Sequence, residues 1–525
     1  MQLAGIGPSD WITINARHNP EGQCFVRANR ERLSFERVAS DVALLAGSLR
    51  DAGLERGDRI AALATDSVEY MELMLASMRL GTTIVPLNFR LATDEVRLLL
   101  DATQPAALFV SPRYEDAITA GRASLGQTLR LTGGVDGPTG GTSACVRELI
   151  ESAVGPGVVE SQSVDDDILA MPMTSGTTGI PKGVMQSQRM LKAIAMQGII
   201  DLDFRKDDFA YSGASLFHIS GMGHLFYLLA RGGSSLILPQ FDTDEVLWWM
   251  QEGGITRCML IPSMVISLLS HPDVRASRYP QLRAIMYGGA QIAPSTIHEM
   301  LSVFDCDLFN GFGAGTEAGG QTMFTPADHR FALEHDVSLL GSIGKPIFGV
   351  DLKLCDEEGV EVPHGDIGEI FTRSDTVMSG YFNQPELTAR SITEGWFHAG
   401  DCAFYDSAGY LRLAGRRNDM IIRGGENVYP NEIEDTLGGH PSVHEVAVIG
   451  LPDAYWGEIV AAVVVLRPGA SLDLDEAREY CVGKIATYKI PTHLEVVDDF
   501  PKNSTGKIVK HELRSSIVAR SATAG

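Results

Sequence analysis

The stretch Thr174-Ser-Gly-Thr-Thr-Gly-Ile-Pro-Lys-Gly183 determines how the rest of the sequence is interpreted. It combines four hydroxyl side chains, three glycines and one lysine. Glycine lets a backbone approach a ligand closely, clustered N–H groups and hydroxyls surround an anion, and Lys182 adds a point charge. Such a loop suits a polyphosphate. A surface loop without a ligand is the alternative, since Gly/Ser/Thr clusters are typical of loops, and residue chemistry alone leaves both interpretations open.

The stretch differs from the P-loop of kinases and GTPases, which requires a glycine, four residues and then Gly-Lys-Ser/Thr. Pro181 stands where that pattern, counted from Gly176, requires its second glycine. The order Thr-Ser-Gly-Thr-Thr-Gly-x-Pro-Lys-Gly instead resembles the signature loop of the adenylate-forming (AMP-binding) superfamily, which includes acyl- and aryl-CoA synthetases, beetle luciferases and peptide-synthetase adenylation domains. The resemblance implies an ATP-phosphate site formed by Thr174, Ser175, Gly176, Thr177, Thr178, Gly179 and Lys182.

Composition limits the possible partners. A chain of 525 residues exceeds a single ordinary core, so two or more domains are expected. The net charge of −24 makes nucleic acid and anionic membrane surfaces poor partners. Seven scattered cysteines without a CxxC pair favour reduced thiols in a cytosolic protein. With no signal-peptide pattern and no apolar run of ~18 residues, we expect a cytoplasmic protein without membrane insertion. The oligomeric state is open, and a homodimer is one candidate.

Apolar periodicity predicts alternating helices and strands in the first third of the chain. This alternation favours an α/β fold with a largely parallel sheet. Residues 133–146, rich in Gly, Thr and Ser, are expected to form a surface loop. The expected helices are 34–54, 70–80 and 93–102, and the expected strands are 59–64, 83–87 and 106–111.

The segment Asn310-Gly-Phe-Gly-Ala-Gly-Thr-Glu317 resembles the family's aromatic-Gly-x-Thr-Glu motif. In the family the aromatic residue packs on adenine, the threonine contacts phosphate and the glutamate holds Mg²⁺. The resemblance therefore assigns to the nucleotide and its metal the residues Asn310, Gly311, Phe312, Thr316 and Glu317, with Glu317 as the metal ligand.

This segment also departs from the family pattern. Gly313 occupies the position expected for the aromatic residue. Either the loop carries one extra residue and Phe312 packs on adenine, or adenine lacks that stack. Gly313-x-Gly315-x-x-Ala318 matches a dinucleotide-binding fingerprint as well, but a lone match is weak and no convincing acidic partner follows about 20 residues on.

Two segments resemble family motifs that border the acid and the adenine. Leu216-Phe-His-Ile-Ser-Gly-Met222 resembles the motif whose histidine borders the acyl pocket, although a lone histidine in an apolar stretch is usually a core residue. Met286-Tyr-Gly-Gly-Ala290 resembles the adenine-flanking turn, a tight strand-to-helix turn being the alternative. The resemblance thus makes His218 a wall or gate of the acyl pocket and places Gly289 and Ala290 at adenine. The expected pocket lining is Ser220, His224, Gly289 and 312–315.

Later motifs extend the resemblance towards the C-terminal end. Trp396-Phe-His-Ala-Gly-Asp401 resembles the motif whose aspartate holds the ribose hydroxyls, a role that suits a carboxylate. Arg416 matches an arginine that reaches ribose or phosphate. Asn418 matches the family's hinge, which is commonly Asp or Lys. The resemblance therefore implies an N-terminal AMP- and acyl-binding domain over 1–417 and a small, mobile α+β domain over 418–525.

The expected C-terminal domain contains two further motifs. Arg423-Gly-Gly-Glu-Asn-Val-Tyr-Pro430 resembles the loop that CoA ligases bring to the site for thioester formation, which implies a pantetheine contact at Gly425. Pro501-Lys-Asn-Ser-Thr-Gly-Lys507 resembles the motif of the catalytic lysine, whereas a lone lysine is ordinarily only solvated.

Together these motifs imply an ATP- and Mg²⁺-dependent ligase that adenylates a small carboxylic acid and transfers the acyl group to coenzyme A. Lys507, Thr316, Glu317 and His218 are the expected catalytic residues. An acyl-AMP ligase that loads a separate carrier protein is the main alternative. A luciferase-like oxygenase, an inactive nucleotide-binding module and a dehydrogenase are remoter. The acid is not readable and could be aromatic, alicyclic or of medium chain length.

Overall fold

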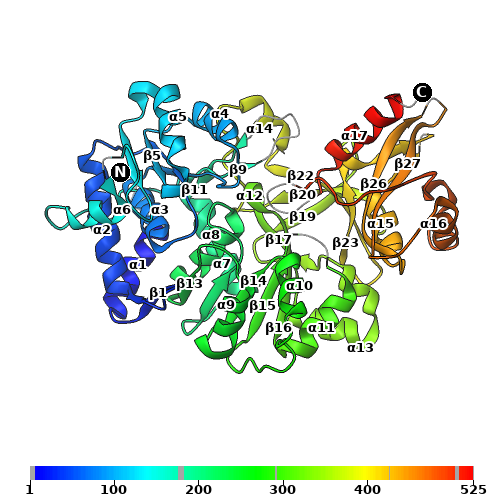
Figure 1. The fold of residues 1–525 in the computed structure, drawn as a ribbon, viewed down its shortest axis with the longest axis horizontal. Coiled ribbons are helices and arrows are strands. Elements are labelled where there is room, and N and C mark those ends of the chain that lie inside the picture. The colour runs from blue at the N-terminus through cyan, green and yellow to red at the C-terminus, as the bar shows by residue number, and fades with distance from the viewer. Residues whose placement is uncertain are drawn as a thin grey trace. The chain divides into compact units, whose positions relative to one another are not determined.

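The computed structural model describes residues 6–142, 144–174, 182–289, 292–424, 426–453, 455–502 and 508–523, except for the side chains of 521–523. The chain forms two compact units (Figure 1). The larger unit comprises residues 1–351 and 372–397, and the smaller comprises 352–371 and 398–525.

The first sheet of the larger unit has seven strands among the described residues. Its strands are parallel except for the antiparallel edge strand β11. In spatial order they are β11 (Gln186–Ser187), β8 (Ile168–Ala170), β4 (Thr83–Pro86), β3 (Arg59–Leu63), β5 (Ala107–Val110), β6 (Leu131–Gly134) and β7 (Ala144–Cys145).

The second sheet of this unit has nine described strands and is parallel through its centre. Strands β2, β17 and β18 join it antiparallel at the two edges. In spatial order the strands are β18 (Lys345–Pro346), β17 (Gly319–Phe324), β16 (Asp307–Ala314), β15 (Ala284–Gly288), β14 (Arg257–Leu260), β12 (Phe209–Ser212), β13 (Ser234–Ile237), β1 (Gln23–Arg27) and β2 (Arg32–Ser34).

Helices cover the faces of these sheets. Helix α3 begins where the Ser67 hydroxyl accepts a hydrogen bond from the N–H of Tyr70, and it ends at Gly81, whose φ is 72°. The helices are α1 (Pro8–His18), α2 (Phe35–Asp51), α3 (Val68–Leu80), α4 (Thr93–Thr103), α5 (Asp116–Leu125), α6 (Val146–Glu151), α7 (Gln188–Asp201), α8 (Ile219–Arg231), α9 (Thr243–Trp248), α10 (Pro262–Ser270), α11 (Pro294–Phe304), α12 (Gly315–Ala318), α13 (Pro326–His335) and α14 (Pro385–Ser391).

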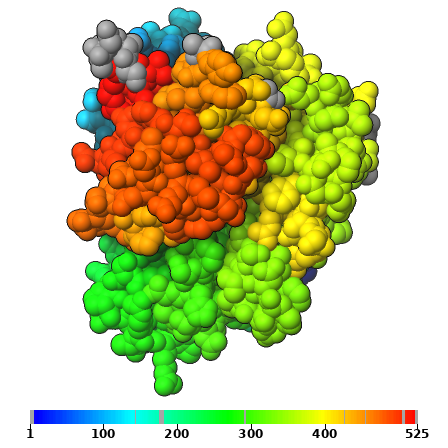
Figure 2. All heavy atoms as spheres, turned by 90° about the vertical axis from the view of Figure 1, so that its right-hand side faces the viewer, coloured from blue at the N-terminus to red at the C-terminus, as the bar shows by residue number. Residues whose placement is uncertain are grey.

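The smaller unit has a core of its own, and Figure 2 shows the orange-to-red C-terminal residues as one compact body. Its described residues form a sheet of five strands, antiparallel except for the parallel pair β27 and β28. The elements are β24 (Ile421–Arg423), β25 (Glu426–Val428), α15 (Pro430–Gly438), β26 (Val443–Asp453), β27 (Gly457–Leu466), α16 (Leu474–Cys481), β28 (His493–Val496) and α17 (Lys510–Thr523).

A further five-stranded sheet precedes this body in sequence. The boundaries between the two compact units fall within three of its strands, at residues 351/352, 371/372 and 397/398. Its strands are β19 (Asp351–Cys355), β20 (Gly368–Arg373), β21 (Ile392–Thr393), β22 (Trp396–Tyr405) and β23 (Leu411–Arg416).

The predicted α/β class, with mainly parallel N-terminal sheets and a small α+β C-terminal part, is confirmed. The compact units do not divide at 418, because 398–417 cluster with the C-terminal residues. The hinge at 418 stays a prediction. No described helix is long and apolar enough to cross a membrane. Of the seven cysteines, all free, only Cys306 is partly exposed.

One local expectation differs from the structure. The sequence predicts a surface loop over 133–146; residues 135–142 carry no helix or strand, whereas Gly133 and Gly134 are buried in strand β6. A Cβ added at Gly133 would lie 2.3 Å from the ring of Phe109 on the neighbouring strand β5. The glycine therefore makes room for an aromatic ring, and its presence does not indicate a turn.

Candidate active site

The two ends of the predicted phosphate loop lie side by side. Strands β9 (Met173–Thr174) and β10 (Lys182–Gly183) pair antiparallel, with Thr174 opposite Lys182. This strand pairing places the first hydroxyl residue and the lysine of the motif on neighbouring strands. The other predicted loop residues, Ser175, Gly176, Thr177, Thr178 and Gly179, lie outside the described residues.

Glu317, on the short helix α12, is the centre of the described contacts. Its Oε1 atom accepts hydrogen bonds from the Thr174 hydroxyl at 3.4 Å and from the Tyr381 hydroxyl at 3.3 Å. Burial raises the pKa of Glu317, and these hydrogen bonds together with the charge of Lys182 oppose the rise. The structure therefore brings Thr174, Lys182 and Glu317 together, although Thr174 and Glu317 are 143 positions apart in the sequence.

Tyr381 is a member of this cluster that the sequence did not single out as functional. Its ring lies 5.3 Å from Lys182 Nζ, a distance suited to a cation–π contact. Backbone hydrogen bonds tie its segment to the end of the loop, from Phe382 N to Gly183 O and from Met185 N to Gly380 O. Tyr381 lies in the run Gly380-Tyr-Phe-Asn-Gln-Pro385, and nothing in that local pattern points to Glu317.

The backbone of Thr316 is held by Gln186. The Gln186 amide donates a hydrogen bond of 2.8 Å to the backbone carbonyl of Thr316, and the Gln186 side chain is fully buried. Gln186 lies three residues after Gly183. The segment that leaves the first predicted phosphate-binding motif therefore contacts the second one at Thr316.

The predicted adenine residues meet at the ends of strands β15 and β16. These strands are parallel, with Gly288 opposite Gly311, and a Cβ at Gly288 would lie 2.6 Å from the Gly311 carbonyl oxygen. Gly289 follows β15 with φ 86°, a conformation that favours glycine. Asn310 and Phe312 lie on β16, and Phe312 is half-buried. Ala290 lies outside the described residues.

The glycines around Gly313 do not form a dinucleotide-binding turn. Strand β16 runs into the four-residue helix α12 and returns as β17, which is antiparallel to it. A dinucleotide fingerprint requires a parallel strand–helix–strand unit. A Cβ at Gly313 would lie 2.2 Å from the Gly319 carbonyl oxygen, so this glycine permits close approach of two strands. The dehydrogenase alternative is therefore wrong.

His218 is the N-cap residue of helix α8. The start of this helix is near α12, since a Cβ at Gly315 would lie 3.8 Å from the Ile219 side chain. Asp66 fixes the preceding loop by accepting a hydrogen bond of 3.0 Å from Leu216 N. Burial raises the pKa of Asp66 to about 7, opposed by bonds from the Leu216 N–H and the Ser215 hydroxyl and by Arg90.

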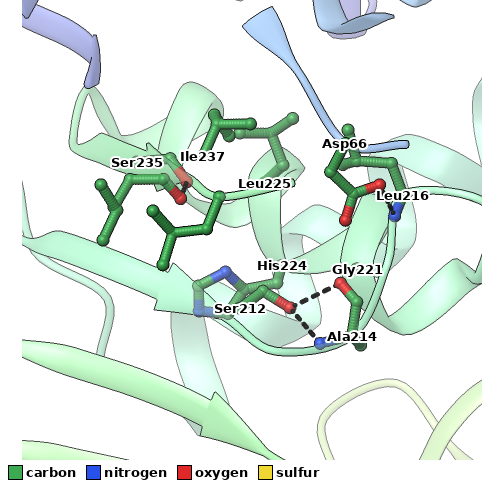
Figure 3. A pocket seen from close by; sticks show the side chains of 11 residues that line it. Asp66, Ser212, Ala214, Leu216, Gly221, His224, Leu225, Ser235 and Ile237 are labelled. Atoms are coloured by element: carbon green, nitrogen blue, oxygen red, sulfur yellow. Dashed lines mark hydrogen bonds between the residues drawn. The ribbon is translucent and has the colours of Figure 1, made fainter. Parts of the chain in front are cut away.

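A small cavity lies beneath this loop (Figure 3), with Asp66, Ser212 and His224 among its lining residues. Its volume is about 20 Å³, which is room for a single water molecule. Burial lowers the pKa of His224 to about 3, so the ring is neutral. Ser220, also expected in the acyl pocket, is exposed on α8.

The predicted ribose residues lie in the smaller unit. Asp401 and Arg416 are paired across strands β22 and β23, with the Arg416 Nε atom 3.6 Å from Asp401 Oδ1. Glu369 accepts hydrogen bonds from Gly400 N and from Arg417, which holds this strand pair. Gly425 and Lys507 lie outside the described residues.

The donors around Glu317 fit a magnesium ion better than a protein-caged metal. The described residues contain no group of three or more His, Cys, Asp or Glu side chains that could hold a metal. Mg²⁺ is commonly bound through one or two carboxylates together with substrate phosphates. A single half-buried carboxylate beside a hydroxyl and a phosphate-type loop matches that mode.

The fold and this cluster define a nucleotide-using α/β enzyme with a small C-terminal domain. The family model of the AMP-binding enzymes matches residues 12–382, and that of their C-terminal domain matches 432–507. The chain therefore belongs to the AMP-binding enzyme family, as the sequence motifs predicted.

Relatives of nearly equal length agree with this assignment. Feruloyl-CoA synthase of Amycolatopsis sp is 34% identical over 98% of this chain and 99% of that protein. Fatty acid–[acyl-carrier-protein] ligase ScoC of Streptomyces coeruleorubidus is 32% identical over 97% and 96%. The ATP-bound crystal structure of MatB from Rhodopseudomonas palustris aligns with a TM-score of 0.87, at 30% identity over 98% and 99%. The chain is thus an adenylate-forming ligase of the acid-activating kind.

Proposed function

We propose that the chain is an ATP-dependent acid–CoA ligase. In the first step a carboxylate oxygen of the acid attacks the α-phosphorus of ATP, the bond to pyrophosphate breaks and an acyl-adenylate forms. In the second step the thiolate of coenzyme A attacks the acyl carbon and AMP leaves. The observation that supports this function best is the convergence of Thr174, Lys182, Thr316 and Glu317 from distant parts of the sequence.

The chemistry of the first step is mainly positioning and charge stabilisation. Negative charge moves onto phosphate oxygens, and the Lys182 ammonium offers it a compact positive charge. The Thr174 hydroxyl offers a hydrogen bond beside it. Glu317 would hold Mg²⁺, which supplies further positive charge to the phosphates when bound. Tyr381 keeps the Glu317 carboxylate and the Lys182 side chain in place through its hydroxyl and its ring.

The remaining roles rest on the motifs alone. Asp401 and Arg416 would hold the ribose, Gly289 and Phe312 would contact adenine, and His218 would border the acid. Lys507 would act on the carboxylate and the α-phosphate in the first step.

Two measurements test the function. Pyrophosphate release with ATP is measured over a panel of aromatic, alicyclic and medium-chain acids, and the active acids are then offered coenzyme A or a phosphopantetheinylated carrier protein. We expect pyrophosphate release with at least one acid and faster acyl transfer to coenzyme A. Faster transfer to the carrier would favour the alternative suggested by the relative ScoC. Absence of pyrophosphate release with every acid would contradict the proposal.

A further inference from the structure

Helix α12, which carries Thr316 and Glu317, is four residues long. The last four carbonyl groups of a helix have no partner within it, so a helix of this length cannot pair its own carbonyls. In the structure all four are paired nonetheless. The Gly315 carbonyl accepts a hydrogen bond from the N–H of Gly319 at the end of the helix. The carbonyls of Thr316, Glu317 and Ala318 accept theirs from distant parts of the chain, which therefore fix the placement of the motif.

Two of these three distant donors lie on one segment, residues 374–382, which we call the strap. The backbone N–H of Met378 donates to the Glu317 carbonyl at 2.7 Å. The Thr376 hydroxyl donates to the Ala318 carbonyl at 2.8 Å. Both Thr376 and Ala318 are fully buried, so loss of the hydroxyl would leave the carbonyl unpaired away from water, which destabilises its surroundings.

The strap also pairs with the segment that leaves the predicted phosphate loop. The N–H of Ser379 donates to the Met185 carbonyl, and the N–H of Met185 donates to the Gly380 carbonyl, both at 2.9 Å. Tyr381, also in the strap, reaches the Glu317 carboxylate through its hydroxyl. One segment therefore holds both the backbone and the side chain of Glu317, and it ties them to the end of the phosphate loop.

Gln186 supplies the third donor from that same end of the loop. Its amide nitrogen donates to the Thr316 carbonyl at 2.8 Å, whereas its amide oxygen has no partner among the described residues. The side chain is fully buried, and an apolar side chain of similar size would avoid the cost of an unpaired oxygen there. What distinguishes the amide from such a side chain is the bond that it donates to Thr316.

We infer that Thr376 and Gln186 are positioning residues, which act on the nucleotide site through the backbone carbonyls of α12. This inference rests on the proposed function, in which Glu317 holds Mg²⁺ on the phosphates of ATP. A carboxylate that is already fixed binds a metal more tightly than one that must first be ordered, because ordering costs free energy. Loosening of α12 should therefore weaken the binding of ATP most where Mg²⁺ is limiting.

The test is calorimetric titration with ATP at limiting and at saturating Mg²⁺. Thr376→Val keeps the shape of the side chain and removes its hydroxyl, and Thr376→Ser retains the hydroxyl. We expect Thr376→Val to raise the Kd of ATP by ~5-fold or more at limiting Mg²⁺, the scale of one buried hydrogen bond. The increase should be smaller at saturating Mg²⁺. Thr376→Ser should restore the wild-type Kd, and Gln186→Met should change the Kd in the same direction as Thr376→Val.

A double substitution separates positioning from stability alone. In the Glu317→Gln background the carboxylate is already lost, so Thr376→Val should have little further effect on the Kd of ATP, whereas its lowering of Tm should persist. Thr103→Val is the matched control, because the Thr103 hydroxyl is also buried and donates to the Leu99 carbonyl at 2.7 Å. This control should lower Tm and leave the Kd of ATP unchanged.

Two outcomes would overturn the inference. One is an unchanged Kd of ATP at limiting Mg²⁺ in folded Thr376→Val and Gln186→Met, and if one of these variants does not fold, the other decides. The second is a loss of affinity on Thr376→Val that is equally large with and without the Glu317 carboxylate. Wild-type protein that binds ATP with Mg²⁺ but releases no pyrophosphate with any acid would instead reject the proposed function, and the Kd values would still decide the inference.

Discussion

The Glu317 carboxylate accepts hydrogen bonds from Thr174 and Tyr381, and the charge of Lys182 acts on it through space. Glu317→Gln keeps the shape of the side chain and removes its charge. We expect pyrophosphate release to fall by ~10²-fold, the usual scale for a lost electrostatic partner. The loss should be greater at limiting than at saturating Mg²⁺. Unchanged turnover at both concentrations would rule out the metal-binding role.

The Tyr381 hydroxyl contributes to the same site at the scale of a single atom. Tyr381→Phe removes the hydrogen bond to Glu317 and keeps the ring beside Lys182. A hydrogen bond to a charged group contributes about 1.5 kcal/mol or more, so adenylation should fall by ~10-fold. Tyr279→Phe is the control, because its hydroxyl donates to the Val274 carbonyl at 2.8 Å and its loss should lower Tm without slowing adenylation. Equal rates for Tyr381→Phe and the wild type would show that the contact has no part in the reaction.

The ionisation of Asp66 is expected to make the stability of the folded protein depend on pH. Its folded-state pKa of about 7 lies above the unfolded value of 3.8, so the folded protein holds the proton more tightly. Its contribution to stability is present below pH 3.8 and is lost as pH rises through 7. Asp66→Asn still accepts the Leu216 hydrogen bond but does not ionise. The variant's Tm relative to wild type should therefore rise by ~2 °C or more between pH 5 and pH 8. A Tm difference that stays constant with pH would contradict this assignment.

At the scale of elements, the antiparallel pair β16–β17 flanks the Thr316-Glu317 motif, and a bulge shifts its register between Phe312 and Gly313. Its bulge depends on Gly313, because a Cβ there would meet backbone atoms at 2.2 Å and 2.9 Å. Gly313→Ala should therefore cost about 1–3 kcal/mol of stability through overpacking. At Gly320 a Cβ would meet only the end of the Ile347 side chain at 3.2 Å, so Gly320→Ala is the matched control. Thermal unfolding of both variants checks the difference, and equal Tm values would contradict it.

The same elements show which features a sequence can indicate. Apolar runs such as 59–64 and 106–111 were recognisable as strands because they are buried on both faces, and they are observed as Arg59–Leu63 and Ala107–Val110. The buried strand through Gly133 was not recognisable, since its glycine is explained by a ring on the neighbouring strand. Local composition carries no record of that neighbour.

Part of the candidate site is recognisable from sequence motifs, and part is visible only in the structure. Thr174, Lys182, Thr316 and Glu317 belong to motifs, and the structure brings these motifs together. The contact of Tyr381 with Glu317 spans 64 positions, and no local spacing signals it. Among the described residues the buried amide of Gln321 has no hydrogen-bond partner, which becomes visible only once the partners of every buried atom are known. Long-range packing and hydrogen-bond accounting therefore require the fold.

At the scale of the whole molecule, we propose that the part of the chain after Asn418 serves the two half-reactions in turn. Lys507 matches the catalytic lysine, and Asn418, in the short turn Arg417–Asp419, matches the hinge. Lys507→Ala should lower acyl-adenylate formation by ~10²-fold or more, while thioester formation from preformed acyl-adenylate continues. Asn418→Pro should instead spare acyl-adenylate formation and lower thioester formation. Proline fixes its own φ and restricts the residue before it, so the hinge could not change conformation. Both half-reactions are measured on both variants, and equal loss of both halves in folded variants would contradict the alternation.

The free cysteines have a practical consequence for experiments on the intact molecule. Burial raises the thiol pKa values, to about 12 for both Cys306 and Cys402, and so suppresses the thiolate form that reacts with alkylating reagents. Alkylation of these cysteines should then require local opening of the fold around each thiol. Cys24 and Cys258 lie in the larger unit and Cys481 lies in the smaller one. The order in which these sites acquire a mass tag under increasing denaturant therefore reports which unit opens first, so the chain carries its own opening probes without any engineered label.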